Sequence, residues 1–220
     1  ESEFDTIEKR SADPFYISEE TKNKLHEAFK YWKGKTTSEL AASYMAEETL
    51  TAIEHNIFTP GNYFYNGVGH VTVQYEKVLE IGYEGIINEV KEELSRCQFY
   101  DEDYITKSQL LKAIIRSCEA VIDYAERYAK LALELSETCS DQVRKNELLA
   151  IAHNCMNVPR KGAISFYEAC QSFWFVQMLL QVESSGHSIS PGRFDQYMYP
   201  YFKKDLEEGK ITRAFAQELM

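Results

Sequence analysis

Residues 165–183 read SFYEACQSFWFVQMLLQVE, and this stretch decides the fold class. Its apolar side chains fall on nearly every side of the predicted helix, whereas a surface helix keeps them on one stripe. A helix of this kind is surrounded by protein on all its faces. Its most apolar part, residues 173–182, is too short, and too often interrupted by Gln, to cross a bilayer. We therefore expect a buried central helix, with more protein around it than these 220 residues.

Helical periodicity continues on both sides of this stretch. The other predicted helices cover residues 18–32, 37–55, 75–96, 102–138, 141–157, 201–208 and 212–220. Ser18 and Thr212 are the expected N-caps of the first and last of them. The last helix has only begun where the sequence stops, which indicates a chain cut at its C-terminus. The chain is predicted to be mainly α, and to form one unit over residues 1–220 with no internal boundary.

The composition argues against several classes of partner. The formal net charge is −11, from 35 acidic and 24 basic residues, so the chain should repel nucleic-acid backbones and anionic membranes. A hydrophobic content of 44% is typical of a globular protein rather than a disordered one. No basic segment leads into an apolar run, as a secretory signal would require. We expect a cytoplasmic protein with no nucleic-acid or membrane partner.

The cysteines lie 15 to 21 residues apart, at Cys97, Cys118, Cys139, Cys155 and Cys170. This spacing contains no CxxC pair, so it does not indicate a zinc or iron–sulfur site. An odd number of cysteines without a secretory signal indicates reduced thiols. We expect packing roles for them, with no metal ligand and no catalytic cysteine in this chain.

Two loops fit neither a helical nor a strand period, and each contains a Gly-His dipeptide. Residues 58–75, FTPGNYFYNGVGHVTVQY, contain Gly69-His70, and residues 184–200, SSGHSISPGRFDQYMYP, contain Gly186-His187. Glycine in such a loop predicts close approach of the backbone, and binding residues concentrate in ordered loops. GVGH lacks the third glycine of a dinucleotide fingerprint, which disfavours a phosphate cradle. His70 is either a hydrogen-bonding or proton-transfer group or a histidine with purely structural contacts.

The second loop also brings a serine, a histidine and an aspartate close together in sequence. This does not indicate a hydrolase, because the chain has no GxSxG elbow and such triads are defined by geometry. We expect Arg193 and Asp195 to hold the loop together by hydrogen bonds. Adjacent glutamates such as Glu19 and Glu20 diverge on a helix and are solvated rather than catalytic.

The run GHSISPGRFDQYMYPYF, residues 186–202, closely resembles a segment of glycyl radical enzymes of the pyruvate formate-lyase-like superfamily. Residues 10–20, RSADPFYISEE, and 63–86, YFYNGVGHVTVQYEKVLEIGYEGI, resemble the same proteins in the same order. The nearest branch is that of the dehydratases and C–X lyases. The resemblance implies a ten-stranded α/β barrel wrapped in helices. This chain would be part of its helical N-terminal portion, truncated at both ends.

For the whole protein the resemblance implies a radical lyase of anaerobic metabolism. An S-adenosylmethionine-dependent iron–sulfur activase makes a glycyl radical, which passes to a cysteine. The resulting thiyl radical takes a hydrogen atom from a small substrate, and water or another group then leaves. The glycine and cysteine motifs are absent here, so the resemblance implies no catalytic residue, no bound cofactor and no activity for this fragment alone. It implies a homodimer for the full-length protein.

The resemblance also implies two substrate-binding residues in this chain, His70 in GVGH and Ser188 in GHS. Each can donate and accept a hydrogen bond, which suits a hydroxylated substrate. They would orient the substrate and stabilise the departing hydroxyl. The expected activity is that of a glycerol, propanediol or hydroxyproline dehydratase. Pyruvate formate-lyase (formate C-acetyltransferase) and choline lyase-like members are alternatives, and a non-catalytic helical interaction module is an alternative of another class.

Overall fold

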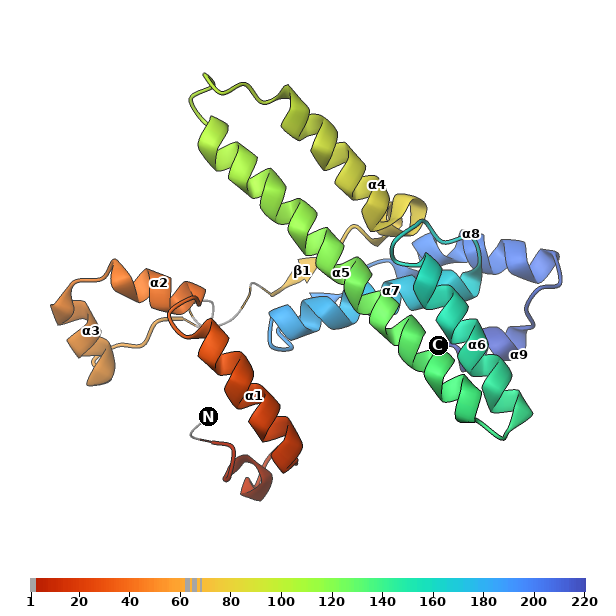
Figure 1. Cartoon of the computed structure of the whole chain (residues 1–220), viewed down its shortest axis with the longest axis horizontal. Helices are drawn as coiled ribbons and strands as arrows, with labels where there is room; N and C mark the ends of the chain where they lie inside the picture. Colours follow the sequence, from red (N-terminus) through yellow and green to blue (C-terminus); the bar gives the residue numbers. More distant parts are fainter. Residues whose placement is uncertain (1–2, 62–63, 65–66, 68) are drawn as a thin grey trace. The chain divides into compact units, whose positions relative to one another are not determined.

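The structure, a computed structural model, describes residues 3–61, 64, 67 and 69–220 (Figure 1). It divides into two compact units, Glu1–Asn66 and Gly67–Met220. Nearly all the regular structure in both units is helical, which confirms the predicted mainly α class. No described helix has the length and apolar character needed to span a membrane.

The first unit contains the short helix η1 and three α-helices. Their bounds are η1 Ile7–Lys9, α1 Glu19–Trp32, α2 Thr37–Ser43 and α3 Glu47–Glu54. Ser18 caps α1 as predicted, because its side chain accepts a hydrogen bond from the Thr21 backbone N–H. The single helix predicted over residues 37–55 is wrong. Ala46 has an extended backbone (ψ 152°) that separates α2 from α3, and the acidic pair Glu47 and Glu48 opens α3.

The second unit is built on four long helices. They are α4 Tyr75–Arg96, α5 Tyr104–Thr138, α6 Gln142–Asn157 and α7 Phe166–Glu183. Figure 1 shows α5 as the longest of them, and it packs against both α4 and α6. The predicted central helix is α7, which contacts α4, α5, α6 and a later helix, α8. Within this chain α7 still exposes 57% of Trp174 and 69% of Val182.

The chain ends in two shorter helices, α8 Phe194–Glu207 and α9 Arg213–Glu218. Thr212 caps α9 as predicted. The prediction for α8 is wrong, because the helix begins before Pro200 rather than after it. A proline inside a helix costs about 3 kcal/mol. Burial of Tyr197 and Met198 offsets this cost, since each large apolar side chain contributes about 1.5–3 kcal/mol.

A kink at Gly82 fixes the first part of α4. Gly82 has φ 64° and ψ 178°, and a Cβ there would lie 2.3 Å from the Arg160 carbonyl oxygen. The loop between α6 and α7 docks at this kink. Glu84 N–H donates to the Arg160 carbonyl at 2.9 Å, and Ala163 N–H donates to the Leu79 carbonyl at 2.8 Å. The kink therefore holds the first turns of α4 against the α6–α7 loop.

The main apolar cluster lies where α4, α7, α8 and α9 meet. Its buried members are Tyr75, Val78, Leu79, Phe166, Ala169, Val176, Tyr197, Met198 and Ala216. The helices of this cluster are joined to two short strands. β1 Val71–Thr72 comes just before α4, and β2 Ile189–Ser190 lies between α7 and α8. The cluster therefore supports the segments that carry both strands.

Candidate functional site

The two glycine-containing loops predicted from the sequence meet in the structure. β1 and β2 pair in parallel, with Val71 opposite Ile189 and Thr72 opposite Ser190. Just before this pair, the His70 backbone N–H donates to the Ser188 carbonyl oxygen at 2.9 Å. The two predicted substrate-binding residues are therefore neighbours, although they lie far apart in the sequence.

Glycine is required where the loops touch. A Cβ on Gly69 would lie only 1.8 Å from the His187 carbonyl oxygen, and one on Gly67 would lie 2.6 Å from that of Glu183. No side chain fits at these distances. The close backbone approach predicted for this loop is confirmed, and its partners are the end of α7 and the second loop.

His70 and Ser188 share an uncommon backbone conformation. Their φ angles are 56° and 53°, in the left-handed region that residues other than glycine rarely adopt. Each residue directly precedes one strand of the pair. Such a conformation costs of the order of 1–3 kcal/mol and persists only where the surroundings hold it, often at functional sites. The surrounding structure therefore fixes the backbone at both predicted positions, as it does at Ser185, whose φ is also 53°.

An open hollow of about 350 Å³ lies over the strand pair. Its lining residues are His70, Val71, Thr72, Ser188, Ile189 and Ser190. The His70 and His187 rings meet edge to face, with centroids 4.8 Å apart. His187 was not among the predicted site residues, although its Gly-His dipeptide matches that of His70. Together these side chains offer imidazole and hydroxyl groups, which donate and accept hydrogen bonds to an uncharged polar ligand.

Arg193 and Asp195 make hydrogen bonds, but to each other, two residues apart. The guanidinium donates two hydrogen bonds to the carboxylate, at 3.0 and 2.9 Å. These bonds hold the pKa of Asp195 well below its usual range, and both side chains are exposed. Asp195 is thus engaged as an ion-pair partner at the start of α8.

The cysteines do not contribute to this hollow. All five thiols are free, and none is among the residues that line it. Burial raises the pKa of Cys155 to about 11 and that of Cys170 to about 12. These two thiols therefore stay protonated at neutral pH. In the described part of the chain, no three His, Cys, Asp or Glu side chains are grouped so that they could hold a metal ion.

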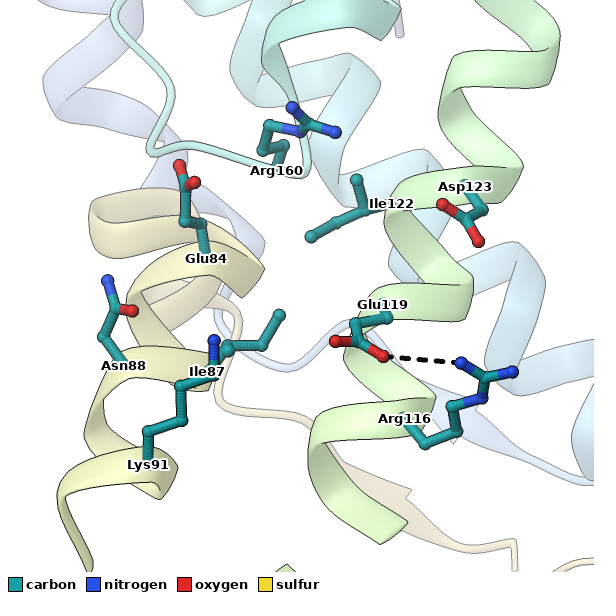
Figure 2. Close-up of a pocket in the computed structure, with 9 residues that line it drawn as sticks. All are labelled: Glu84, Ile87, Asn88, Lys91, Arg116, Glu119, Ile122, Asp123 and Arg160. Carbon is teal, nitrogen blue, oxygen red and sulfur yellow. Dashed lines mark ion pairs between the residues drawn. The ribbon is translucent and has the colours of Figure 1, made fainter. Parts of the chain in front are cut away.

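A second cavity, of about 410 Å³, lies between α4, α5 and the loop after α6 (Figure 2). Charged side chains of both signs surround it, with Ile87 and Ile122 between the two helices. Arg116 pairs with Glu119 at 3.7 Å, and Arg160 pairs with Glu126 of α5. Neither predicted substrate-binding residue is in its lining, and we assign no function to it.

The sequence profile described as "Pyruvate formate lyase-like" matches residues 1–220. This chain belongs to the pyruvate formate lyase-like family. Its relatives are glycyl radical dehydratases and lyases. A (2S)-3-sulfopropanediol dehydratase from Klebsiella oxytoca is 37% identical over 97% of this chain and 26% of its own length.

Solved structures of this family are similar over almost the whole chain. A structure that concerns 1,2-propanediol dehydration in Roseburia inulinivorans is 66% identical, with a TM-score of 0.84, and the match covers 99% of this chain and 26% of that one. The glycerol-bound B12-independent glycerol dehydratase from Clostridium butyricum is 56% identical, with a TM-score of 0.81, over 99% of this chain and 27% of that one. The chain thus spans about a quarter of the length of these relatives.

Proposed function

We propose that the full-length protein that carries this chain is a glycyl radical dehydratase, and that it eliminates water from a small vicinal diol. The observation that carries the proposal is the pairing of β1 with β2, which places His70 and Ser188 side by side at an open hollow. The two relatives at 66% and 56% identity, whose names concern 1,2-propanediol and glycerol, support a diol as substrate.

In this proposal the chain binds and orients the substrate. A vicinal diol has two hydroxyl groups, and His70 and Ser188 each provide a side chain that can bind one. Held in this way, the diol keeps one carbon–oxygen bond in a fixed orientation for cleavage. The departing hydroxyl must gain a proton to leave as water, and a donor such as the His70 imidazole would stabilise it.

The residues of this chain do not fit the radical chemistry itself. No cysteine is among the residues that line the hollow, and the predicted radical-bearing glycine motif is absent from the sequence. We propose that the radical that abstracts hydrogen, and the S-adenosylmethionine-dependent activase that would create it, act at positions outside these residues. We also propose that the full-length protein is a cytoplasmic homodimer, and that residues 1–220 alone are inactive.

The test is to measure turnover of 1,2-propanediol and glycerol by the full-length protein after anaerobic activation. Ser188→Ala should lower kcat/KM about tenfold, since a lost hydrogen bond to a neutral group is worth about 0.5–1.5 kcal/mol. Ser185→Ala is a matched control, because Ser185 has the same φ of 53° and is exposed but does not line the hollow. Equal kcat/KM for the two variants would contradict the proposed role of Ser188.

The product separates the proposal from its alternatives. A diol dehydratase forms an aldehyde and water from 1,2-propanediol without any second substrate. A pyruvate formate-lyase forms formate from pyruvate and coenzyme A, and a choline lyase releases an amine from choline. An activated protein that turns over none of these compounds would favour the non-catalytic interaction module.

A further inference from the structure

Gln177 of α7 links the two site loops. Its side-chain Nε2 donates to the Ile189 carbonyl oxygen at 2.9 Å, and its Oε1 accepts a hydrogen bond from the Tyr75 hydroxyl. Ile189 comes directly after Ser188. Tyr75 is the first residue of α4, three residues after the end of β1. One side-chain amide therefore reaches both parts of the site.

The hydrogen-bonding needs of the two partners fix the residue type at position 177. The Ile189 carbonyl can only accept, so the amide nitrogen must face it. The amide oxygen then faces Tyr75, whose hydroxyl must donate. Tyr75 is 1% exposed, and burial raises its pKa to about 12, so the hydroxyl keeps its proton. An amide supplies the donor and the acceptor at once, whereas a carboxylate supplies two acceptors.

A tyrosine supports the same segment two residues further along the chain. The Tyr197 hydroxyl donates to the Pro191 carbonyl oxygen at 2.7 Å, and the Tyr197 and Tyr75 rings stack with centroids 5.5 Å apart. β2 and the residue after it are thus held from the core by two side chains. The left-handed conformation of Ser188 requires a fixed backbone in the residues that follow it, and these two side chains provide it.

We propose that Gln177 is a positioning residue for substrate binding. It holds Ile189 in the register that keeps Ser188 in its left-handed conformation beside His70. This inference rests on the proposed function of His70 and Ser188. Gln177 itself does not line the hollow, so it acts on turnover through the segments that it holds, and we expect the β2 segment with Ser188 to carry the effect.

The test uses the activated full-length protein with 1,2-propanediol as substrate. Gln177→Glu is close to isosteric, keeps an acceptor for Tyr75 and places an oxygen against the Ile189 carbonyl. Tyr75→Phe keeps the ring packing and removes the donor to the amide, which gives a second, uncharged variant. Both should lower kcat/KM about tenfold. Gln171→Glu introduces the same charge on α7 at another partly buried glutamine and should stay within twofold of the parent.

A double-variant comparison separates positioning from a general structural role. If Gln177 acts through Ser188, Gln177→Glu should change the same parameter, kcat or KM, as Ser188→Ala. It should then lower kcat/KM by less than threefold when added to Ser188→Ala. A merely structural role predicts that the two effects multiply, because changes at independent sites add in free energy.

Three results would overturn the inference. One is multiplication of the two effects, and another is a Gln177→Glu variant within twofold of the parent while Ser188→Ala is impaired. In both cases the proposed function stands. The third is an unimpaired Ser188→Ala variant, which would remove the proposed role of Ser188 and the inference with it.

Discussion

Gly69→Ala is the sharpest test of how the two site loops fit together. A Cβ at this position would lie 1.8 Å from the His187 carbonyl oxygen and 2.8 Å from the His187 Cγ. Ordinary van der Waals contact begins at 3.4 Å, so the gap to the oxygen must widen by 3.4 − 1.8 = 1.6 Å. The obstacle is backbone, which cannot rotate away as the end of a flexible side chain can. One loop must move away from the other.

The adjacent residue makes that movement costly. The hydrogen bond from His70 N–H to the Ser188 carbonyl, at 2.9 Å, breaks when the loops separate by this distance. Its loss costs about 1 kcal/mol, and overpacking typically costs about 1–3 kcal/mol. We expect the local structure to lose about 2–4 kcal/mol in total. A displacement of this size also misplaces His70 relative to Ser188, and a misplacement of about 1 Å can lower turnover about 100-fold.

The assay is kcat/KM for 1,2-propanediol in the activated full-length protein. Gly69→Ala should lower it about 100-fold, while the far-ultraviolet circular dichroism stays that of the parent. Gly61→Ala is the control, because a Cβ there meets nothing within 4 Å. A Gly69→Ala variant within threefold of the parent would show that the loops do not approach each other as described.

Four further predictions concern stability and reactivity. Ser188→Gly should be about 1 kcal/mol more stable than Ser188→Ala in thermal unfolding, because glycine adopts a φ of 53° without strain; equal stability would contradict the left-handed conformation. Gly82→Ala should lower the melting temperature more than Gly209→Ala, because both have positive φ but only Gly82 faces backbone within 3 Å; a similar loss for both would argue against the kink in α4. Cys155 and Cys170 should react with iodoacetamide at pH 8 at least tenfold more slowly than after unfolding in urea, because burial raises their pKa values to about 11 and 12. Since the unfolded thiols lose their protons near pH 9.0, these two groups should also lower stability as the pH rises above about 9.

The long helices were predictable because many residues share the same period. The predicted ranges for α4, α5, α6 and α7 agree with the structure to within about two residues at each end. Local sequence signals predicted helix boundaries less well where tertiary contacts determine the boundary. Ala46 has no cap-forming side chain, so nothing in its residue type marks the break before α3. Pro200 predicts the start of a helix. Because Tyr197 and Met198 are buried, however, α8 begins earlier, at Phe194.

The site was predictable only in part. Glycines and a missing period identified both loops, and the family resemblance pointed to His70 and Ser188. The pairing of the loops had no local signal, because a parallel contact between two-residue strands leaves no pattern in either segment. The partner of Gly69 was equally hidden, since a close backbone approach predicts a glycine but not the segment that it touches. The proposed substrate-binding roles remain predictions that the Ser188 variants test.

The polar residues of α7 connect this helix to neighbouring segments by hydrogen bonds. In the sequence they only interrupt an apolar run. In the structure, Glu168 near the start of α7 accepts hydrogen bonds from the Ile164 backbone N–H at 2.8 Å and from the Asn157 side chain at 3.1 Å. Gln177, further along the helix, binds Tyr75 and Ile189. A polar group that is removed from water is stabilised by such partners. The two residues therefore fasten the α6–α7 loop to the first part of α7 and β2 to the second part, so α7 supports both the kink of α4 and the proposed substrate site.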